Sequence, residues 1–85
     1  MKRMTLSEYK RNMGILIDLE DSETYEKNHL PGAKNIPYER LLLNYRDLLD
    51  KNESYYLYCE KGRKSHRLAN ILEIYGYDVT QVYNG

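Results

Sequence analysis

The sequence predicts an α/β fold, in which a mainly parallel sheet carries helices on its faces. Three observations predict it. Short apolar runs alternate along the chain with segments whose apolar residues recur at helical spacing. Two strand candidates, residues 15–17 and 55–58, are continuous apolar runs, which suit strands buried on both faces of a parallel sheet. The length of 85 residues suits one hydrophobic core, so we expect a single domain over residues 1–85.

The first part of the chain is predicted to start with a short strand at Met4–Thr5, followed by a segment capped by Ser7. A buried strand at Ile15–Ile17 comes next, because its β-branched residues favour extended backbone, and it enters a loop at Asp18. Ser22 is then expected to cap a short helix that continues to about Asn28.

The middle of the chain is punctuated by proline and glycine. Pro31 and Gly32 predict a turn, and residues 34–36 follow as a brief strand. Pro37 suits the start of a helix over residues 38–49, since proline is tolerated in the first turn.

The last part repeats the alternation with a buried strand at residues 55–58, directly before Cys59. A helix is expected from Ser65, and Gly76 suits its end because glycine adopts positive φ. A final strand is predicted over residues 79–83. The apolar stripe of that helix falls at i, i+3, i+4 and i+7 and consists of Leu68, Ile71, Leu72 and Tyr75.

Composition excludes several classes of protein. Thirteen Lys and Arg balance thirteen Asp and Glu, and 41% of residues are hydrophobic, which excludes a disordered chain and a polycationic nucleic-acid tail. Any basic site must therefore be local, and no nucleic-acid partner is expected. No apolar run is long enough to span a bilayer, and the N-terminus lacks the apolar segment of a secretion signal, so we expect no membrane partner.

Cysteine and histidine usage points to a reducing compartment. Cys59 is the only cysteine, which excludes an intrachain disulfide, and neither His29 nor His66 lies in a cluster typical of a zinc site. We therefore expect a cytoplasmic protein without a metal or another cofactor.

The strongest local signal is the loop that begins at Cys59, between a predicted strand and a predicted helix. Sites in open α/β sheets lie beyond the carboxyl ends of the strands, where the amides and the dipole of the next helix favour negative charge. Cations at 61, 63, 64 and 67 add to this effect, and Gly62 gives the backbone freedom to curl around an anion. The expected substrate-binding loop consists of Glu60, Lys61, Gly62, Arg63, Lys64 and Ser65.

Two interpretations of Cys59 compete. A lone cysteine after an apolar strand is often a small core residue. The four cations and the glycine instead favour a reactive thiolate, because an inert cysteine gains nothing from them. The loop is then suited to hold an anionic sulfur species or an oxyanion.

Two separated motifs make the chain resemble the rhodanese-like sulfurtransferase domains. The first is LID at 16–18 followed by YEKNHLPGAKNIP at 25–37, and the second is Tyr58-Cys59 with its loop up to Ser65. The stretch HLPGAKNIP at 29–37 is specific to this group, and the resemblance covers residues 15–85.

The resemblance implies a doubly wound α/β domain of about five strands. It also implies that Cys59 accepts a sulfane sulfur from a small donor such as thiosulfate, becomes a persulfide, and passes the sulfur to cyanide or a thiol, including a protein thiol. Sulfurtransferases of the family have a six-residue loop, here Cys59 to Lys64, whereas related phosphatase-type and arsenate-handling members have one residue more. The shorter loop favours sulfur transfer, because a tetrahedral oxyanion needs more room.

The chain departs from the family pattern at three places. Glu20 stands where the family commonly has arginine, which removes a cation from the expected mouth of the pocket. Lys64 replaces a frequent arginine and lacks its bidentate fork. Many members also continue with a further helix beyond the position of Gly85. These departures keep open a second interpretation, in which a non-catalytic module uses the basic loop to dock an acidic partner.

The remaining polar candidates have less specific roles. Asp18 is expected to face the Cys59 loop and support it by accepting hydrogen bonds. His29 is interpreted as structural because it precedes a turn, and His66 as mainly facing solvent, although it could reach the pocket. A phosphatase or arsenate reductase would need arginine where Ser65 stands.

Overall fold

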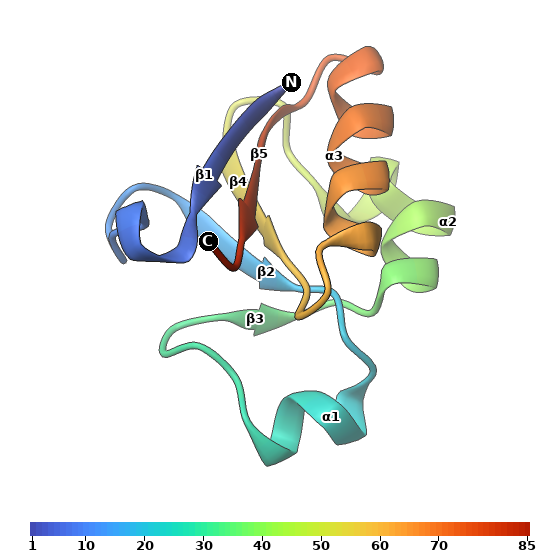
Figure 1. Cartoon of the computed structure of the whole chain (residues 1–85). Helices are drawn as coiled ribbons and strands as arrows, with labels where there is room; N and C mark the ends of the chain where they lie inside the picture. Colours follow the sequence, from blue (N-terminus) through green and yellow to red (C-terminus); the bar gives the residue numbers. More distant parts are fainter.

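A five-stranded sheet forms the centre of the molecule in the computed structural model, which describes residues 1–85 (Figure 1). The strand order is β1-β5-β4-β2-β3, and every neighbouring pair is parallel, so the α/β fold with about five strands is confirmed. The elements are β1 (Lys2–Thr5), the 3-10 turn η1 (Leu6–Glu8), β2 (Ile15–Asp18), α1 (Ser22–Lys27), β3 (Lys34–Asn35), α2 (Tyr38–Leu48), β4 (Ser54–Tyr58), α3 (Arg63–Ile74) and β5 (Asp78–Tyr83).

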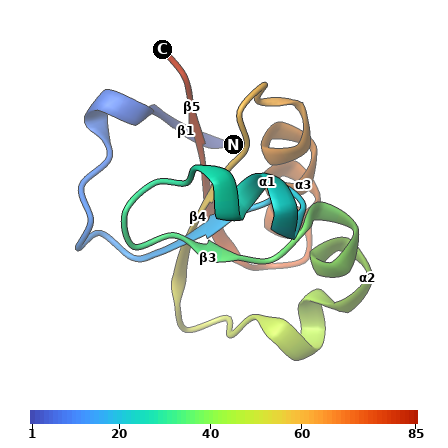
Figure 2. The ribbon, with the colours of Figure 1, turned by 90° about the horizontal axis from the view of Figure 1, so that it is seen from below.

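Helices α2 and α3 cover one face of the sheet, and a 3-10 turn with loop segments covers the other (Figure 2). The main core lies under α2 and α3. Its fully enclosed members include Leu41, Leu57, Leu68, Leu72 and Val79. A smaller cluster on the opposite face is built around three buried residues, Leu16, Ala33 and Val82. Both faces of the sheet are therefore covered by apolar side chains, as strands made of continuous apolar residues require.

The short helix α1 lies beyond the carboxyl end of the sheet rather than on a face (Figures 1 and 2). Tyr25 of α1 donates from its hydroxyl to the carbonyl of Ala33, which ties the helix to the loop before β3. The carboxyl ends of β2, β4 and β5 consequently meet α1 and the start of α3 at one edge, where the sequence places Cys59.

The expected helix caps are wrong in two places. Asp21, not Ser22, caps α1, since its carboxylate accepts from the N–H of Thr24 at 2.8 Å. Thr5, not Ser7, precedes the turn η1, and the Glu8 carboxylate accepts from the Thr5 N–H at 2.8 Å. In both cases another residue that is able to cap has the better backbone position.

The two long helices differ from expectation at their ends. Helix α3 begins at Arg63, two residues before the expected Ser65, because Gly62 adopts φ 79° and turns the chain directly into the helix. Helix α2 ends at Leu48 and is interrupted at Asn44, whose φ of −133° is not helical. The predicted end of α3 at Gly76 is confirmed, with φ 91°.

The apolar segments of the helices are short. No helix combines the length and the apolar character that crossing a bilayer requires.

Candidate active site

Cys59 lies at the carboxyl end of β4 and is buried, with 2% of its surface exposed. Its sulfur is hydrogen-bonded to one residue of α3. The backbone N–H of Ser65 donates to Sγ at 3.2 Å, and Sγ lies 3.3 Å from the Ser65 hydroxyl. The expected ring of amides is only partly formed, since Ser65 is the one residue whose N–H reaches the sulfur.

Glu20 takes an unexpected part in holding the loop. Its carboxylate accepts from the backbone N–H of Glu60 at 2.8 Å and lies 3.8 Å from the ammonium group of Lys64. The Glu60 amide therefore points to a side chain from β2's end and not to the sulfur. Glu20 thus forms a brace between Glu60 and Lys64, near the two ends of the loop, where the sequence suggested only the removal of a cation.

Asp18 does not support the Cys59 loop, contrary to expectation. Its side chain is 2% exposed and accepts from the N–H of Glu20 at 2.9 Å, which closes its own turn after β2. Burial raises the pKa of the Asp18 carboxyl, and the Glu20 N–H opposes this rise. Asp18 thus shapes the backbone that presents Glu20, and it acts on the loop only through that residue.

Gln81 is a buried residue at the site that the sequence did not single out. From the middle of β5 its Nε2 donates to the carbonyl of Gly62 at 2.9 Å and to the hydroxyl of Ser65 at 3.0 Å. Its Oε1 accepts from Nε of Arg3 at 2.9 Å. The available signal was a large polar side chain in the predicted final strand, between Val79 and Val82, where a buried and unpaired amide would be costly.

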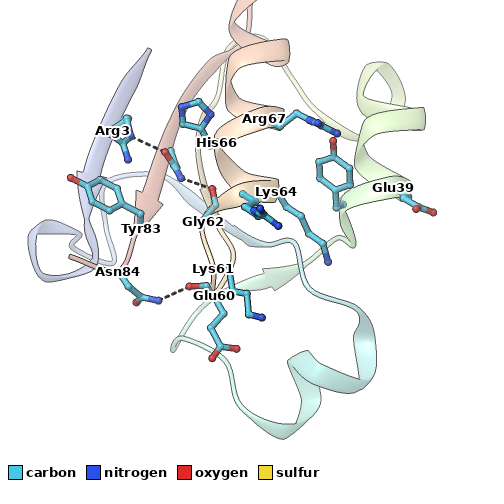
Figure 3. Close-up of a pocket in the computed structure, with 13 residues that line it drawn as sticks. Arg3, Glu39, Glu60, Lys61, Gly62, Lys64, His66, Arg67, Tyr83 and Asn84 are labelled. Carbon is cyan, nitrogen blue, oxygen red and sulfur yellow. Dashed lines mark hydrogen bonds between the residues drawn. The ribbon is translucent and has the colours of Figure 1, made fainter.

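Asn84 is a second residue that the sequence did not single out. Its side-chain amide donates to the carbonyl of Glu60 at 2.7 Å (Figure 3). Because β5 and β4 are parallel neighbours, residues just after their carboxyl ends meet. The loop is consequently held by Glu20 just after β2, by Gln81 of β5 and Asn84 just after it, and by Ser65 of α3.

A basic open cavity of about 1030 Å³ lies over the outer side of the loop. Five cations line it and only two carboxylates, those of Glu39 and Glu60. Figure 3 shows Arg3 on the β1–β5 side of the first turn of α3, with Lys64 and Arg67 on the side of α2. We call this cavity the basic groove, and its cations are Arg3, Lys61, Arg63, Lys64 and Arg67. The positive charge expected near Cys59 is therefore gathered on one surface.

A smaller cavity of about 330 Å³ opens on the other side, between the loop and α1. Three carboxylates line it, those of Asp18, Glu20 and Glu60, together with Lys27 and His29. Cys59 lines neither cavity, so its sulfur lies beneath the loop that separates them.

The two histidines have different surroundings. His29 stacks on the ring of Tyr25 at 3.9 Å, and its Nδ1 lies 2.7 Å from the carbonyl of that residue, which agrees with the structural interpretation. His66 is exposed and also lines the basic groove. No three His, Cys, Asp or Glu side chains converge as metal ligands would.

The chain matches the family described as Rhodanese-like domain over residues 5–85. It is 37% identical over 73 residues to the tRNA sulfurtransferase of Shewanella woodyi, covering 81% of this chain and 15% of that protein. It is 31% identical over 86 residues to the protein YqhL of Bacillus subtilis, covering 99% of this chain and 66% of that protein. The chain thus spans about 15% of the length of the tRNA sulfurtransferases that it matches.

Solved structures support the same relationship. A rhodanese-like domain protein from Staphylococcus aureus superimposes with a TM-score of 0.80 at 29% identity, covering 100% of this chain and 87% of that one. The sheet order, the cysteine at the end of β4 and the match over residues 5–85 agree, and the chain belongs to the rhodanese-like domain family.

Proposed function

We propose that the chain is a sulfurtransferase that carries a sulfane sulfur as a persulfide on Cys59. The observation that carries this proposal is the position of the thiol, which receives the Ser65 N–H at the start of α3 and lies beneath a loop lined by cations. A helix N-terminus favours an anionic sulfur, and the thiolate is the nucleophilic form of cysteine. The relatives named as sulfurtransferases support the same activity.

The first half-reaction loads the cysteine. The Cys59 thiolate attacks the outer sulfur of thiosulfate, a sulfur–sulfur bond forms to Cys59, and the bond to the sulfonate sulfur breaks. Sulfite leaves with the electron pair of that bond. The lysine and arginine side chains of the loop, at positions 61, 63 and 64, attract the anionic donor.

The second half-reaction removes the sulfur from the Cys59 persulfide. Cyanide, or the thiolate of a small molecule or a protein, attacks the outer sulfur of the persulfide and forms a bond to it. The sulfur–sulfur bond breaks, and Cys59 recovers the electron pair as a thiolate. The cycle needs no cofactor. A reducing cytoplasm, where thiol acceptors are abundant, suits this second step.

Intact-mass spectrometry tests the proposal. The protein is incubated with thiosulfate and then with cyanide, beside Cys59→Ser as the matched variant. We expect the mass of one added sulfur in the parent protein, its removal by cyanide, and no addition to the variant. Equal addition to both proteins, or none to the parent with several sulfane donors, would contradict the assignment of Cys59.

The basic groove favours a second candidate function, a module that docks an acidic partner without catalysis. Four of its five cations form no ion pair within the chain: Arg3, Lys61, Arg63 and Arg67. A pull-down with an acidic partner protein separates the candidates. Docking predicts binding that survives Cys59→Ser and is lost when the charges at 61, 63 and 64 are neutralised, whereas sulfur loading that depends on Cys59 favours catalysis.

A further inference from the structure

Gln81 is a buried amide whose polar groups are all hydrogen-bonded. Its side chain is 1% exposed in the middle of β5. A buried amide is costly unless its donors and acceptor find partners. Here the oxygen accepts from Arg3, and the nitrogen donates to the Gly62 carbonyl and to the Ser65 hydroxyl. The amide therefore bridges β1 to the Cys59 loop.

The partners of Gln81 fix the orientation of the amide. The Arg3 guanidinium can only donate and the Gly62 carbonyl can only accept, so the amide oxygen must face the first and the nitrogen the second. Arg3 is held in turn over the ring of Tyr83, with 4.3 Å between Cζ and the ring centre. A rotated amide would place two donors together and two acceptors together. Only one orientation of the Gln81 amide therefore gives all of its hydrogen-bonding groups a partner.

The hydroxyl of Ser65 lies between the carbonyl of Gly62 and the sulfur of Cys59. Its Oγ is 3.3 Å from the Gly62 carbonyl and 3.3 Å from Sγ of Cys59. When Cys59 is a thiol, the S–H donates to Oγ and the single hydroxyl hydrogen serves the carbonyl. When Cys59 is an anion, the sulfur no longer donates, and the hydroxyl hydrogen can turn to it, because a hydrogen bond to a charged acceptor is stronger than one to a neutral carbonyl.

The Gly62 carbonyl keeps its partners when the hydroxyl turns away. Gln81 donates to it at 2.9 Å, and the His66 backbone N–H donates at 3.1 Å. Gln81 also donates to Oγ itself, which holds the oxygen in place while its hydrogen moves. The loss of one hydrogen bond at Gly62 therefore leaves no buried acceptor unpaired.

We infer that Gln81, oriented by Arg3, is a positioning residue that frees the Ser65 hydroxyl to donate to the anionic sulfur of Cys59. Gln81 touches neither the sulfur nor a substrate and acts through Ser65 and Gly62. The consequence for sulfur transfer rests on the proposed use of Cys59 as the nucleophile.

The test is a titration of the thiol itself. Cys59 is the only cysteine, so protein labelled with carbon-13 at cysteine Cβ gives one side-chain signal whose shift follows ionisation. In Gln81→Leu, which keeps the size but loses both donors, we expect the midpoint to move to higher pH. Persulfide formation from thiosulfate at neutral pH should fall about tenfold, the scale of one hydrogen bond to a charged group.

A double-mutant cycle shows whether the effect passes through the hydroxyl. In a Ser65→Ala background, the Gln81→Leu change should move the midpoint no further. Thr80→Val is the matched control, since Thr80 is buried on the same strand next to Gln81, and adjacent side chains of a strand point to opposite faces of the sheet. An unchanged midpoint in folded Gln81→Leu, or an equal shift with and without the Ser65 hydroxyl, would overturn the inference.

A second variant and a readout that is independent of sulfur transfer complete the test. Should Gln81→Leu fail to fold, Arg3→Met removes the orienting donor at the sheet edge and keeps an apolar stem, and the same direction of shift is expected. The thiol titration does not depend on sulfur transfer. If Gln81→Leu shifts the midpoint but the parent protein takes up no sulfur, the inference is supported and the proposed function is contradicted. If the parent takes up sulfur but Gln81→Leu does not shift the midpoint, the proposed function is supported and the inference is contradicted.

Discussion

Two carboxylates, Asp18 and Glu20, lie two residues apart after β2 and act on different groups. Asp18 is buried and closes its own turn, whereas Glu20 reaches the amide of Glu60 and the ammonium group of Lys64. The sequence suggested the opposite division, with Asp18 supporting the loop and Glu20 only removing a cation. The backbone decides, because the turn at Asp18 directs the Glu20 side chain toward the loop.

The buried carboxyl predicts a dependence of stability on pH. Burial raises the pKa of Asp18, so the folded state binds this proton more readily than the unfolded chain does. Its favourable contribution is therefore complete below the ordinary pKa of aspartate and is lost as pH rises through the raised value. Asp18→Asn keeps an oxygen for the Glu20 N–H, and we expect it to increase the free energy of unfolding at neutral pH.

Urea denaturation of the parent and of Asp18→Asn checks this prediction. The advantage of the variant should shrink as the pH falls to about 3, where the parent carboxyl is also neutral. A variant that is less stable at neutral pH, with the same deficit at low pH, would show that the charge of Asp18 is not the cause.

Glu20 predicts an effect on donor affinity. Glu20→Gln keeps an acceptor for the Glu60 N–H and removes the negative charge beside Lys64. We expect the KM for thiosulfate to fall about two- to fivefold with kcat unchanged, because exposed charge pairs contribute up to about 1 kcal/mol. Steady-state kinetics at low salt measures it.

The control for Glu20 is Glu23→Gln on α1, which removes the same charge from an exposed residue that lines neither cavity. The effect of Glu20→Gln should disappear at about 1 M salt, where charges are screened within a few ångströms. Equal changes in both variants would assign the effect to net charge and not to the brace.

At the scale of elements, the sequence was informative wherever a local pattern determines the structure. Residues 15–17, 55–58 and 79–83 lie in strands because their apolar runs have β-branched or aromatic character, and Gly76 ends α3 because only glycine adopts its φ easily. The position of Cys59 at the end of β4 followed from the same local reasoning.

What the sequence did not predict depends on which strands are neighbours. The contact of Gln81 with the Cys59 loop exists because β5 lies beside β4 and β1 lies beside β5. No local pattern within residues 78–83 predicts that β5 lies between β1 and β4. The choice between Asp21 and Ser22 as a cap is decided by differences in backbone angle that two adjacent capping residues cannot reveal.

The two glycines that flank α3 predict a matched pair of variants. Gly62 and Gly76 adopt φ of 79° and 91°, and an added Cβ would meet only ordinary contacts at 3.6 Å and 3.5 Å. Alanine at either position should therefore cost about 1–2 kcal/mol of stability through backbone strain alone. Chemical denaturation measures this cost.

The rate of sulfur loading is expected to differ between the two glycine variants. Only Gly62→Ala should also slow the loading of Cys59, because its carbonyl belongs to the network of Ser65 and Gln81. A loading rate in Gly62→Ala as high as in Gly76→Ala would contradict a functional role for the Gly62 backbone.

The charge of the whole molecule is balanced but unevenly distributed. Thirteen cations match thirteen anions, yet the basic groove gathers five cations around two carboxylates. Association of an anion with this surface is governed by the local field and not by the net charge. The molecule therefore has a strongly positive surface although its net charge is zero.

This asymmetry predicts salt-dependent turnover in a protein of zero net charge. We expect kcat/KM for thiosulfate to fall several-fold as ionic strength rises from about 0.02 to 0.2 M. Arg67→Gln should reduce this slope, whereas Lys10→Gln, outside the groove, should not. A rate that is independent of salt would show that the groove does not guide the donor.

The N-terminal strand connects this surface to the sheet. β1 has a neighbour on one side only, β5, and it carries the Arg3 side chain that orients Gln81. Edge strands and chain ends open with less free energy than central strands do. We therefore expect warming to loosen the hold on the Cys59 loop before the core melts, so that sulfur loading fails at a lower temperature than the one at which the fold unfolds.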